Sequence, residues 1–162
     1  MTENKNQLQK KFTSFTKLAT TPAETERIAR DFAAGLQPGD VVAFFGDLGS
    51  GKTFFIKSLC RALGTVQEAT SPSFTIINEY FTPDDLFVYH FDFYRLEDEQ
   101  ELRNLGLDEF FYNDYICLIE WADKILLHLP ENRWEVWLQF VPHQPESRNI
   151  SIFKKTDEEN ER

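Results

Sequence analysis

The apolar and polar positions near the N-terminus predict a short strand followed by an amphipathic helix. The strand is expected within residues 11–19. Over residues 21–36 apolar side chains recur at intervals of four, which indicates a helix with one buried face. Thr21 is the expected N-cap, Pro22 occupies the first helical position, and Glu24 follows the cap at the spacing of a capping box. A helix start is therefore expected at this point.

A second strand, a glycine-rich loop and a second helix are expected next. Residues 40–45 (DVVAFF) contain a continuous apolar run after Asp40, which is typical of a strand covered on both faces. Residues 46–51 (GDLGSG) form the loop, and residues 52–63 have the composition of a helix that Gly64 ends. This order places the loop between a buried strand and the N-terminus of a helix.

Two hairpins are predicted in the rest of the chain. Residues 74–81 and 86–96 are rich in aromatic and β-branched residues and are joined by TPDD, so we expect antiparallel strands. Residues 133–141 and 148–155 are expected to pair in the same way across PHQPES. The alternation on the first of these strands places four apolar side chains on one face, namely Trp134, Val136, Leu138 and Phe140.

The remaining elements complete a single domain. They are one or two short helices at 97–111, a buried strand at 115–121, and a helix or irregular link at 122–130. We expect residues 12–155 to form one α/β domain with a mixed parallel and antiparallel sheet flanked by helices. Residues 1–11 are expected to be a flexible N-terminus, and residues 156–162 a disordered tail.

Composition and charge exclude several classes of protein. The 162 residues suffice for one domain, and the chain has neither a run of about 18 apolar residues nor an N-terminal signal pattern. We therefore expect a cytoplasmic protein without a membrane interaction. The net charge of −10 opposes direct binding to nucleic acids, so a role in their pathways is expected to depend on a protein partner. Cys60 and Cys117 lack metal-ligand spacing and are expected to be buried, reduced thiols.

Residues 46–53 match the phosphate-binding pattern G-x-x-x-x-G-K-[ST] in full. Glycines allow successive backbone N–H groups to point into one concavity, and the helix that follows adds the positive end of its dipole. In this pattern Lys52 reaches the β- and γ-phosphates of a nucleotide, and the Thr53 hydroxyl binds Mg²⁺. The strand before the loop and the helix after it are the context that the pattern requires. The sequence therefore predicts a P-loop NTPase-like domain that binds ATP or GTP.

Two acidic residues directly follow buried strand candidates. Asp92 ends the run LFVYHFD, and Glu120 ends the run ICLIE. Since ligands bind at the carboxyl ends of strands in open α/β sheets, both are candidates for holding the metal. We favour Glu120 for this role and Asp92 as a second group on the metal or on the attacking water, and the division between them stays open. In SPSFT, Ser73 and Thr75 are candidates for a hydroxyl near the γ-phosphate, and an ordinary turn is equally compatible.

Three further residues leave alternatives open. Arg95 can stabilise charge in a transition state or pair with the acids that follow it, and we prefer the pairing. His90 is expected to be a partly buried structural residue rather than a base. Trp121 can stack on a nucleotide or a partner, or it can belong to the core.

The sequence favours an ATPase that works with a partner over other nucleotide-binding proteins. A small-molecule kinase needs a second substrate site with arginines to clamp the acceptor, and no arginine cluster follows the P-loop. The N-K-x-D pattern of GTPases is also absent from the sequence. A nucleotide-dependent small-molecule phosphotransferase and a regulatory subunit that binds nucleotide without turnover remain as alternatives.

Four motifs together resemble the TsaE family, formerly called YjeE. They are GDLGSGKT, SPSFT, HFDFYRL and IEW, in this order and spacing, and the similarity extends from about Phe15 to Phe140. The resemblance implies a P-loop ATPase that is required for making threonylcarbamoyladenosine at position 37 of tRNAs that read ANN codons. It also implies that the protein binds ATP with Mg²⁺ and hydrolyses it slowly when alone.

The resemblance further implies protein partners. A TsaE protein acts with the TsaD–TsaB heterodimer, in which TsaD carries the transferase site. It does not transfer the threonylcarbamoyl group itself, and its hydrolysis of ATP resets the complex between turnovers. The tRNA is then reached only through the complex, which agrees with the acidic charge of this chain.

The resemblance assigns the candidate site residue by residue. The expected catalytic residues are Lys52, Asp92 and Glu120, and the expected metal ligands are Thr53, Asp92 and Glu120. The expected nucleotide-binding residues are Gly46, Asp47, Leu48, Gly49, Ser50, Gly51, Lys52, Thr53, Phe54, Ser73 and Trp121. Two positions depart from the family. Phe54 replaces a usual Thr and removes a hydroxyl that could reach the α-phosphate, so the contact pattern or affinity is expected to differ, whereas Ser73 replaces Thr with the loss of one methyl group.

Overall fold

The structure, a computed structural model, describes residues 14–156. The predicted flexible N-terminus at 1–11, residues 11–13 of the predicted first strand, and all but the first residue of the predicted tail at 156–162 lie outside the described residues. In chain order the elements are β1 (Phe15–Ala19), α2 (Pro22–Ala33), β2 (Val41–Phe45), α3 (Lys52–Leu63), β3 (Ile77–Phe81), β4 (Phe87–Asp92), α4 (Glu99–Leu105), α5 (Leu107–Phe111), β5 (Ile116–Glu120), the 3-10 helix η2 (Ala122–His128), β6 (Arg133–Val141) and β7 (Gln144–Lys155). Within the described range no helix is long and apolar enough to cross a membrane.

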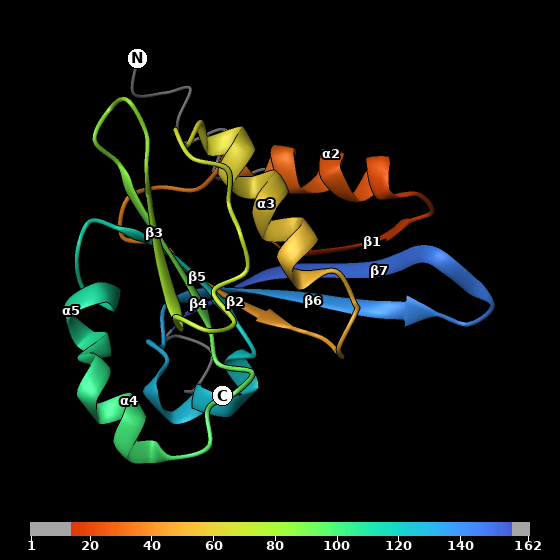
Figure 1. The fold of residues 1–162 in the computed structure, drawn as a ribbon. Coiled ribbons are helices and arrows are strands. Elements are labelled where there is room, and N and C mark those ends of the chain that lie inside the picture. The colour runs from red at the N-terminus through yellow and green to blue at the C-terminus, as the bar shows by residue number, and fades with distance from the viewer. Residues whose placement is uncertain (1–13, 157–162) are drawn as a thin grey trace.

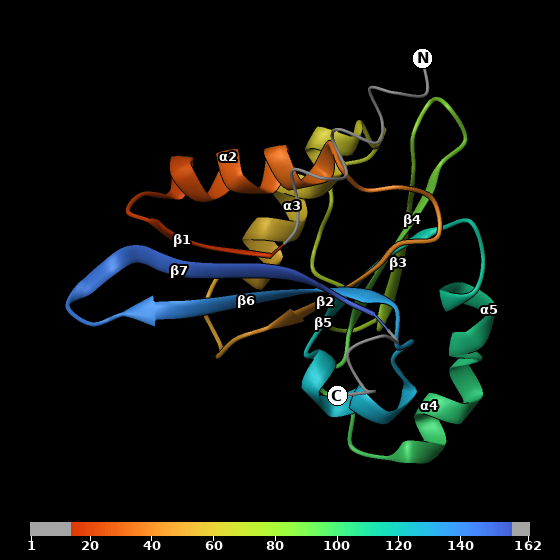
Figure 2. The ribbon, with the colours of Figure 1, turned by 180° about the vertical axis from the view of Figure 1, so that it is seen from behind.

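The strands form one mixed sheet (Figure 1). It has seven strands in the order β1-β7-β6-β2-β5-β4-β3. The central strands β6, β2, β5 and β4 are parallel to one another. At one edge β3 pairs antiparallel with β4, and at the other edge β7 and β1 continue the sheet in antiparallel pairing. Figure 2 shows β1 running along β7 at that edge. The predicted α/β fold with a mixed sheet is confirmed.

Helices cover both faces of the sheet and bury β2 along its whole length. Val42 and Phe44 pack in the apolar core beneath α2 and α3. Val41, Ala43 and Phe45 pack in a second core beneath α4, α5 and η2. Because successive side chains of a strand point to opposite faces, a strand between two cores must be apolar throughout. The continuous apolar run predicted this double burial.

The start of α2 differs from the predicted capping box in one contact. The Thr21 hydroxyl oxygen accepts a hydrogen bond from the backbone N–H of Glu24 at 3.2 Å, as expected of an N-cap. The Glu24 carboxylate, however, accepts a hydrogen bond from the backbone N–H of Thr20 at 2.6 Å. Hydrogen bonding to Thr20 lowers the pKa of Glu24. The carboxylate therefore joins the helix to the residue directly after β1.

Both predicted hairpins are present, with shifted ends. β3 begins at Ile77, because Ile76 has a φ of 68° that interrupts the extended backbone. β7 begins at Gln144, so most of the predicted connection belongs to the strand, and the turn contains His143 with a φ of 61°. The buried face of β6 does not include Phe140, which is 47% exposed because this end of the hairpin projects past the helices (Figure 1).

The two cysteines are buried free thiols, as predicted. Burial raises the pKa of both Cys60 and Cys117 to about 12. The thiols therefore stay protonated at neutral pH and pack as small apolar groups.

Candidate active site

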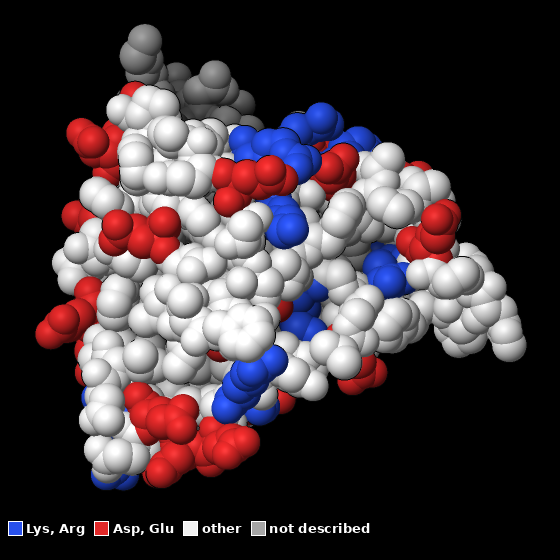
Figure 3. Space-filling model, in the orientation of Figure 1, with Lys and Arg blue, Asp and Glu red and all other residues white. Residues whose placement is uncertain are grey.

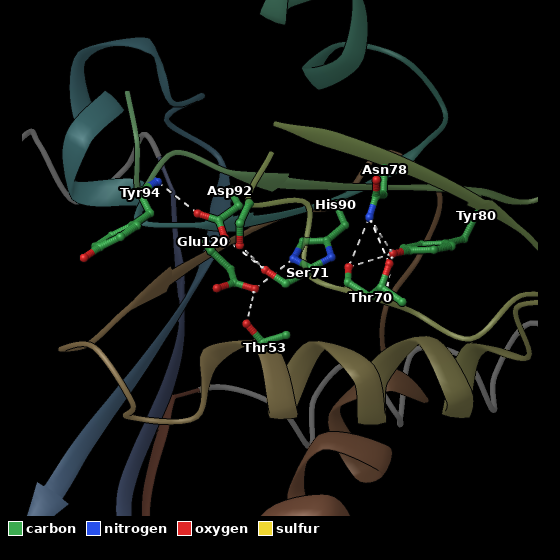
Figure 4. Close-up of polar contacts among 10 residues, drawn as sticks. Thr53, Thr70, Ser71, Asn78, Tyr80, His90, Asp92, Tyr94 and Glu120 are labelled. Carbon is green, nitrogen blue, oxygen red and sulfur yellow. Dashed lines mark hydrogen bonds and ion pairs between the residues drawn. The ribbon is translucent and has the colours of Figure 1, made fainter. Parts of the chain in front are cut away.

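The candidate site lies at the edge of the sheet where the parallel strands β2, β4 and β5 end. The loop between β2 and α3 carries the phosphate-binding pattern of residues 46–53. Asp92 is the last residue of β4 and Glu120 the last residue of β5, and the two are partners in the strand register. Glu120 is also the partner of Phe44 near the end of β2. The parallel topology thus brings the two acids together, and Figure 4 shows Glu120 reaching Thr53 in the first turn of α3 with Asp92 beside it.

The loop depends on glycine where the backbone is crowded or left-handed. Gly46 has a φ of 151°, and Gly51, the N-cap of α3, has a φ of 104°. A Cβ atom on Gly46 would stand 2.5 Å from the Leu138 carbonyl oxygen and 2.5 Å from the Ser50 hydroxyl oxygen. The N–H groups in the first turn of α3 have no carbonyl partner within the helix, so they are available to an anion. The loop therefore has the shape and the free donors that a phosphate chain requires.

Gly46→Ala is expected to distort this loop. The added methyl group would overlap a carbonyl group of β6, at a cost of about 1–3 kcal/mol in the free energy of unfolding. Thermal unfolding and ADP titration measure the two effects. Gly64→Ala is the matched control, because Gly64 also has a positive φ, 83°, but a Cβ there meets no atom within 4 Å. We expect Gly64→Ala to lose stability only and Gly46→Ala to lose ADP binding as well. Equal ADP affinity of the two variants would contradict this expectation.

Lys52 is folded back onto its own loop. Its ammonium donates hydrogen bonds to the carbonyl oxygens of Gly46 at 2.5 Å and Asp47 at 3.0 Å. It also lies 4.0 Å from the centre of the Trp121 ring. Burial lowers the pKa of Lys52, and nearby carboxylates, with Glu120 the strongest, act in the opposite direction. A phosphate group would offer this cation a charged partner in place of two neutral carbonyl groups.

One carboxylate oxygen of Glu120 joins three elements of the fold (Figure 4). Oε1 accepts a hydrogen bond from the Thr53 hydroxyl at 2.7 Å and lies 2.9 Å from Nε2 of His90. Glu120 is 3% exposed, and His90 is completely buried rather than partly buried as predicted. The imidazole therefore fixes the direction in which the Glu120 carboxylate points, toward the first turn of α3.

Asp92 and the segment SPSFT form a second group of polar contacts. Asp92 Oδ1 accepts a hydrogen bond from the backbone N–H of Tyr94 at 2.9 Å, and Oδ2 accepts one from the Ser71 hydroxyl at 3.4 Å. The hydroxyls of Ser71 and Ser73 are hydrogen bonded at 2.7 Å. Thr75 donates instead to a side chain of β3. Ser71 is thus a site residue that sequence reasoning missed, although its position in the same motif as Ser73 was an available signal.

The loop that carries these serines is anchored to β3 (Figure 4). The Tyr80 hydroxyl donates a hydrogen bond to the Thr70 carbonyl at 3.0 Å, and the Asn78 amide donates one to the same carbonyl at 3.1 Å. The backbone N–H of Thr70 donates in turn to the Tyr80 hydroxyl at 2.9 Å. These contacts hold the residue directly before Ser71, and so they place the serine hydroxyls beside the end of β4.

Two larger side chains stand at the entrance of the site. The Arg95 guanidinium lies 4.3 Å from the centre of the Phe74 ring, and in the described part of the chain it forms no ion pair with an acid. The preferred pairing of Arg95 with the acids that follow it is therefore wrong. Trp121 is half-buried with a φ of 56°; it packs against the core beneath α4, α5 and η2, and its ring also lies beside Lys52 and the Tyr94 ring.

Most of the predicted site residues line one cavity of about 320 Å³. Its lining residues are Leu48, Gly49, Gly51, Lys52, Thr53, Phe54, Ser71, Ser73, Asp92, Tyr94, Arg95, Glu120 and Trp121. The other predicted loop residues, Gly46, Asp47 and Ser50, line neighbouring cavities instead. Phe54, which stands where the resembled family usually has Thr, is 40% exposed and borders two of these cavities.

The oxygen atoms in the cavity suit a hard cation. The Thr53 hydroxyl and the carboxylates of Glu120 and Asp92 are ligands of the kind that Mg²⁺ prefers. Across residues 14–156, no group of three or more His, Cys, Asp or Glu side chains is placed to hold a metal ion by itself. Mg²⁺ is commonly bound through one or two carboxylates together with substrate phosphates and water. The residues present therefore fit a magnesium–nucleotide complex better than a free ion.

Comparisons with known proteins identify relatives of this chain. A family model described as "Threonylcarbamoyl adenosine biosynthesis protein TsaE" matches residues 19–150. A Bacillus subtilis protein named tRNA threonylcarbamoyladenosine biosynthesis protein TsaE is 48% identical over 115 residues, which cover 71% of this chain and 71% of the relative. A Rickettsia bellii protein of the same name is 37% identical over 129 residues, covering 79% and 88%. The crystal structure of Bacillus subtilis YdiB matches with a TM-score of 0.71 at 35% identity, covering 90% of this chain and 88% of that chain.

Proposed function

The chain belongs to the TsaE family, which has a role in threonylcarbamoyladenosine biosynthesis for tRNA, and on this basis we propose that it is a P-loop ATPase that binds and hydrolyses Mg-ATP in that pathway. The observation that carries the proposal is the convergence of the glycine-rich loop with Asp92 and Glu120 on one cavity. The loop supplies N–H groups and a cation for phosphates, and the two acids supply oxygen ligands for a metal.

Each residue of the site has a distinct role in this proposal. The N–H groups of the loop and Lys52 hold the β- and γ-phosphates. Thr53, Glu120 and Asp92 would hold Mg²⁺, whose charge offsets that of the phosphates. Asp92 could instead orient the attacking water. The Ser73 hydroxyl is linked to Asp92 through hydrogen bonds with the Ser71 hydroxyl.

Arg95 and Trp121 act at the entrance of the cavity in the same proposal. Arg95 lines the cavity without an acidic partner among the described residues, so it is the candidate for stabilising negative charge in the transition state. The Trp121 ring lies against the Lys52 ammonium and lines the same cavity, so it is the aromatic surface beside the expected phosphate position.

We further propose that the TsaD–TsaB heterodimer is the partner that makes turnover productive. In this scheme the chain does not transfer the threonylcarbamoyl group, works in the cytoplasm, and reaches tRNA only through the complex. The net charge of −10 supports indirect contact with tRNA, and Figure 3 shows acidic side chains over much of one face with basic side chains among them. Basic side chains on α2 and α3 have acidic neighbours, since Arg61 pairs with Glu26 at 2.9 Å and Arg30 with Asp31 at 4.0 Å.

The alternative is a nucleotide-dependent small-molecule phosphotransferase. Such an enzyme clamps a second substrate beside the γ-phosphate, and it usually does so with several arginines. Arg95 is the single arginine in the lining of the described cavity. The chemistry of the lining therefore favours water as the acceptor.

Phosphate release from Mg-ATP tests the proposal directly. We expect weak release by the purified chain alone and a clear increase when a TsaD–TsaB pair from the same organism is added. If the rate of phosphate release is the same with and without the pair, TsaD–TsaB is not the partner, although the chain is still an ATPase. If ATP is consumed without phosphate release and mass spectrometry detects a phosphorylated acceptor, the chain is a phosphotransferase instead.

A further inference from the structure

Arg148 joins the β6–β7 hairpin to the glycine-rich loop. Its Nε donates a hydrogen bond to the Ser50 carbonyl at 2.8 Å, and Nη2 donates one to the Gly49 carbonyl at 3.3 Å. Arg148 is the strand partner of Phe140, and its guanidinium lies 4.7 Å from the centre of that ring. A residue near the end of the chain is thereby bonded to the backbone of the loop.

The hairpin in turn holds the guanidinium in place. Nη1 of Arg148 donates hydrogen bonds to the carbonyl oxygens of Pro145 at 2.6 Å and Ser147 at 2.8 Å. The planar guanidinium is therefore bonded to its own strand on one side and to the loop on the other. A flexible side chain that is fixed in this way can position the backbone that it contacts.

Because each peptide unit is planar, the contacts of Arg148 with loop carbonyl groups also set the directions of the adjoining loop N–H groups. In a trans peptide, the carbonyl oxygen of one residue and the N–H of the next point to opposite sides. By holding the Ser50 carbonyl toward the hairpin, Arg148 turns the N–H of Gly51 away from the hairpin. It holds the preceding carbonyl of Gly49 as well, and the Ser50 N–H of that peptide donates to the Asp47 carbonyl at 3.0 Å. Two consecutive peptide planes are therefore fixed.

The loop needs such a restraint at Gly51. This residue has a φ of 104°, and a Cβ placed on it would meet no atom within 4 Å, so no contact on that side limits its backbone. Its carbonyl accepts the N–H of Phe55 at 2.9 Å, so α3 holds one side of the residue and Arg148 holds the peptide before it. We propose that Arg148 is a positioning residue that keeps the phosphate-binding loop in the conformation that receives nucleotide. The inference rests on the proposed function, because it requires that the loop binds phosphates. Arg148 lines a different cavity from Asp92 and Glu120, so it acts through the loop.

The test compares ADP affinity, ATP kinetics and thermal unfolding in three variants. Arg148→Ala removes both hydrogen bonds to the loop and is expected to weaken ADP binding about tenfold or more. Arg148→Lys keeps the charge but not the fork of donors, so an intermediate loss is expected. Arg103→Ala on α4 is the matched control, because it removes an exposed arginine that pairs with Glu99 at 3.6 Å on the same helix. For Arg148→Ala we expect a raised KM for ATP and a kcat at saturation close to that of the control.

The outcomes separate this inference from the proposed function. If the wild-type chain and Arg103→Ala bind ADP, and both Arg148 variants bind it equally well, Arg148 does not position the loop and the inference is overturned. A lowered unfolding temperature with unchanged ADP affinity overturns it too, because that result describes a role in stability alone. If neither the wild-type chain nor Arg103→Ala binds ADP, the proposed function itself is wrong and the inference falls with it.

Discussion

Lys52→Ala is expected to remove nearly all nucleotide binding. The ammonium donates to two loop carbonyl groups in the structure, and a nucleotide would receive both donors on its charged phosphates. At about 1.5 kcal/mol for each hydrogen bond that involves a charged group, the loss is about 3 kcal/mol, or roughly 100-fold in the dissociation constant. Calorimetric titration with ADP and with ATP in the presence of Mg²⁺ measures this loss.

Lys57→Ala is the matched control for this variant. Lys57 belongs to the same helix, α3, and does not line the site cavity, so its removal tests the loss of a helix lysine without the loss of the site cation. Thermal unfolding of both variants shows whether the loop stays folded, since Lys52 is 4% exposed and its removal leaves two loop carbonyl groups without this donor. If folded Lys52→Ala binds ADP as well as Lys57→Ala does, Lys52 is not the phosphate lysine.

Local patterns in the sequence predicted the elements that carry the site. β2 and α3 are each specified by consecutive residues. A strand buried on two faces requires an apolar run, and the glycine-rich loop marks where the next helix begins. The strand ends at Ile77 and Gln144 were missed. Each follows a residue in the left-handed region, Ile76 or His143, where the chain adopts a conformation that its side chain does not favour. Such turns depend on the packing of the whole hairpin and are not visible in local propensity.

The site was predicted in its residue types but not in its contacts. Asp92 and Glu120 could be placed together, because each ends a buried run and parallel strands end at one edge. The contacts of Glu120 with His90 and of Arg148 with the loop join positions that are far apart in the chain. Hydrophobic periodicity reports which face of an element is buried, and it contains no information on which polar side chains will meet across that face. Those partners had to come from the structure.

Glu120→Gln is expected to leave ATP bound and to reduce its hydrolysis roughly 100-fold or more. Glutamine has the same shape and keeps an oxygen that can accept the hydrogen bond from Thr53 and face His90, so the site should stay folded. What is lost is the negative charge that would hold Mg²⁺ beside the phosphates. Single-turnover phosphate release gives the rate, and ATP titration shows whether binding is retained. Glu120→Ala should also lose hydrolysis, but it leaves buried His90 without this partner and so confounds stability with catalysis.

Two comparisons make the Glu120 prediction decisive. Glu131→Gln is the charge-matched control, because Glu131 is exposed and precedes β6 at the opposite edge of the sheet from the site. Asp92→Asn tests the division of roles, since Asp92 is held by the Tyr94 N–H and the Ser71 hydroxyl rather than by the first turn of α3. A slow Glu120→Gln beside a moderately slowed Asp92→Asn supports Glu120 as the metal-holding acid. If Asp92→Asn is instead the slower variant, Asp92 is the metal-holding acid, because loss of the negative charge that binds the metal should slow hydrolysis most. If Glu120→Gln and Asp92→Asn both hydrolyse ATP as fast as Glu131→Gln does, neither acid takes part in hydrolysis and the proposed site is wrong.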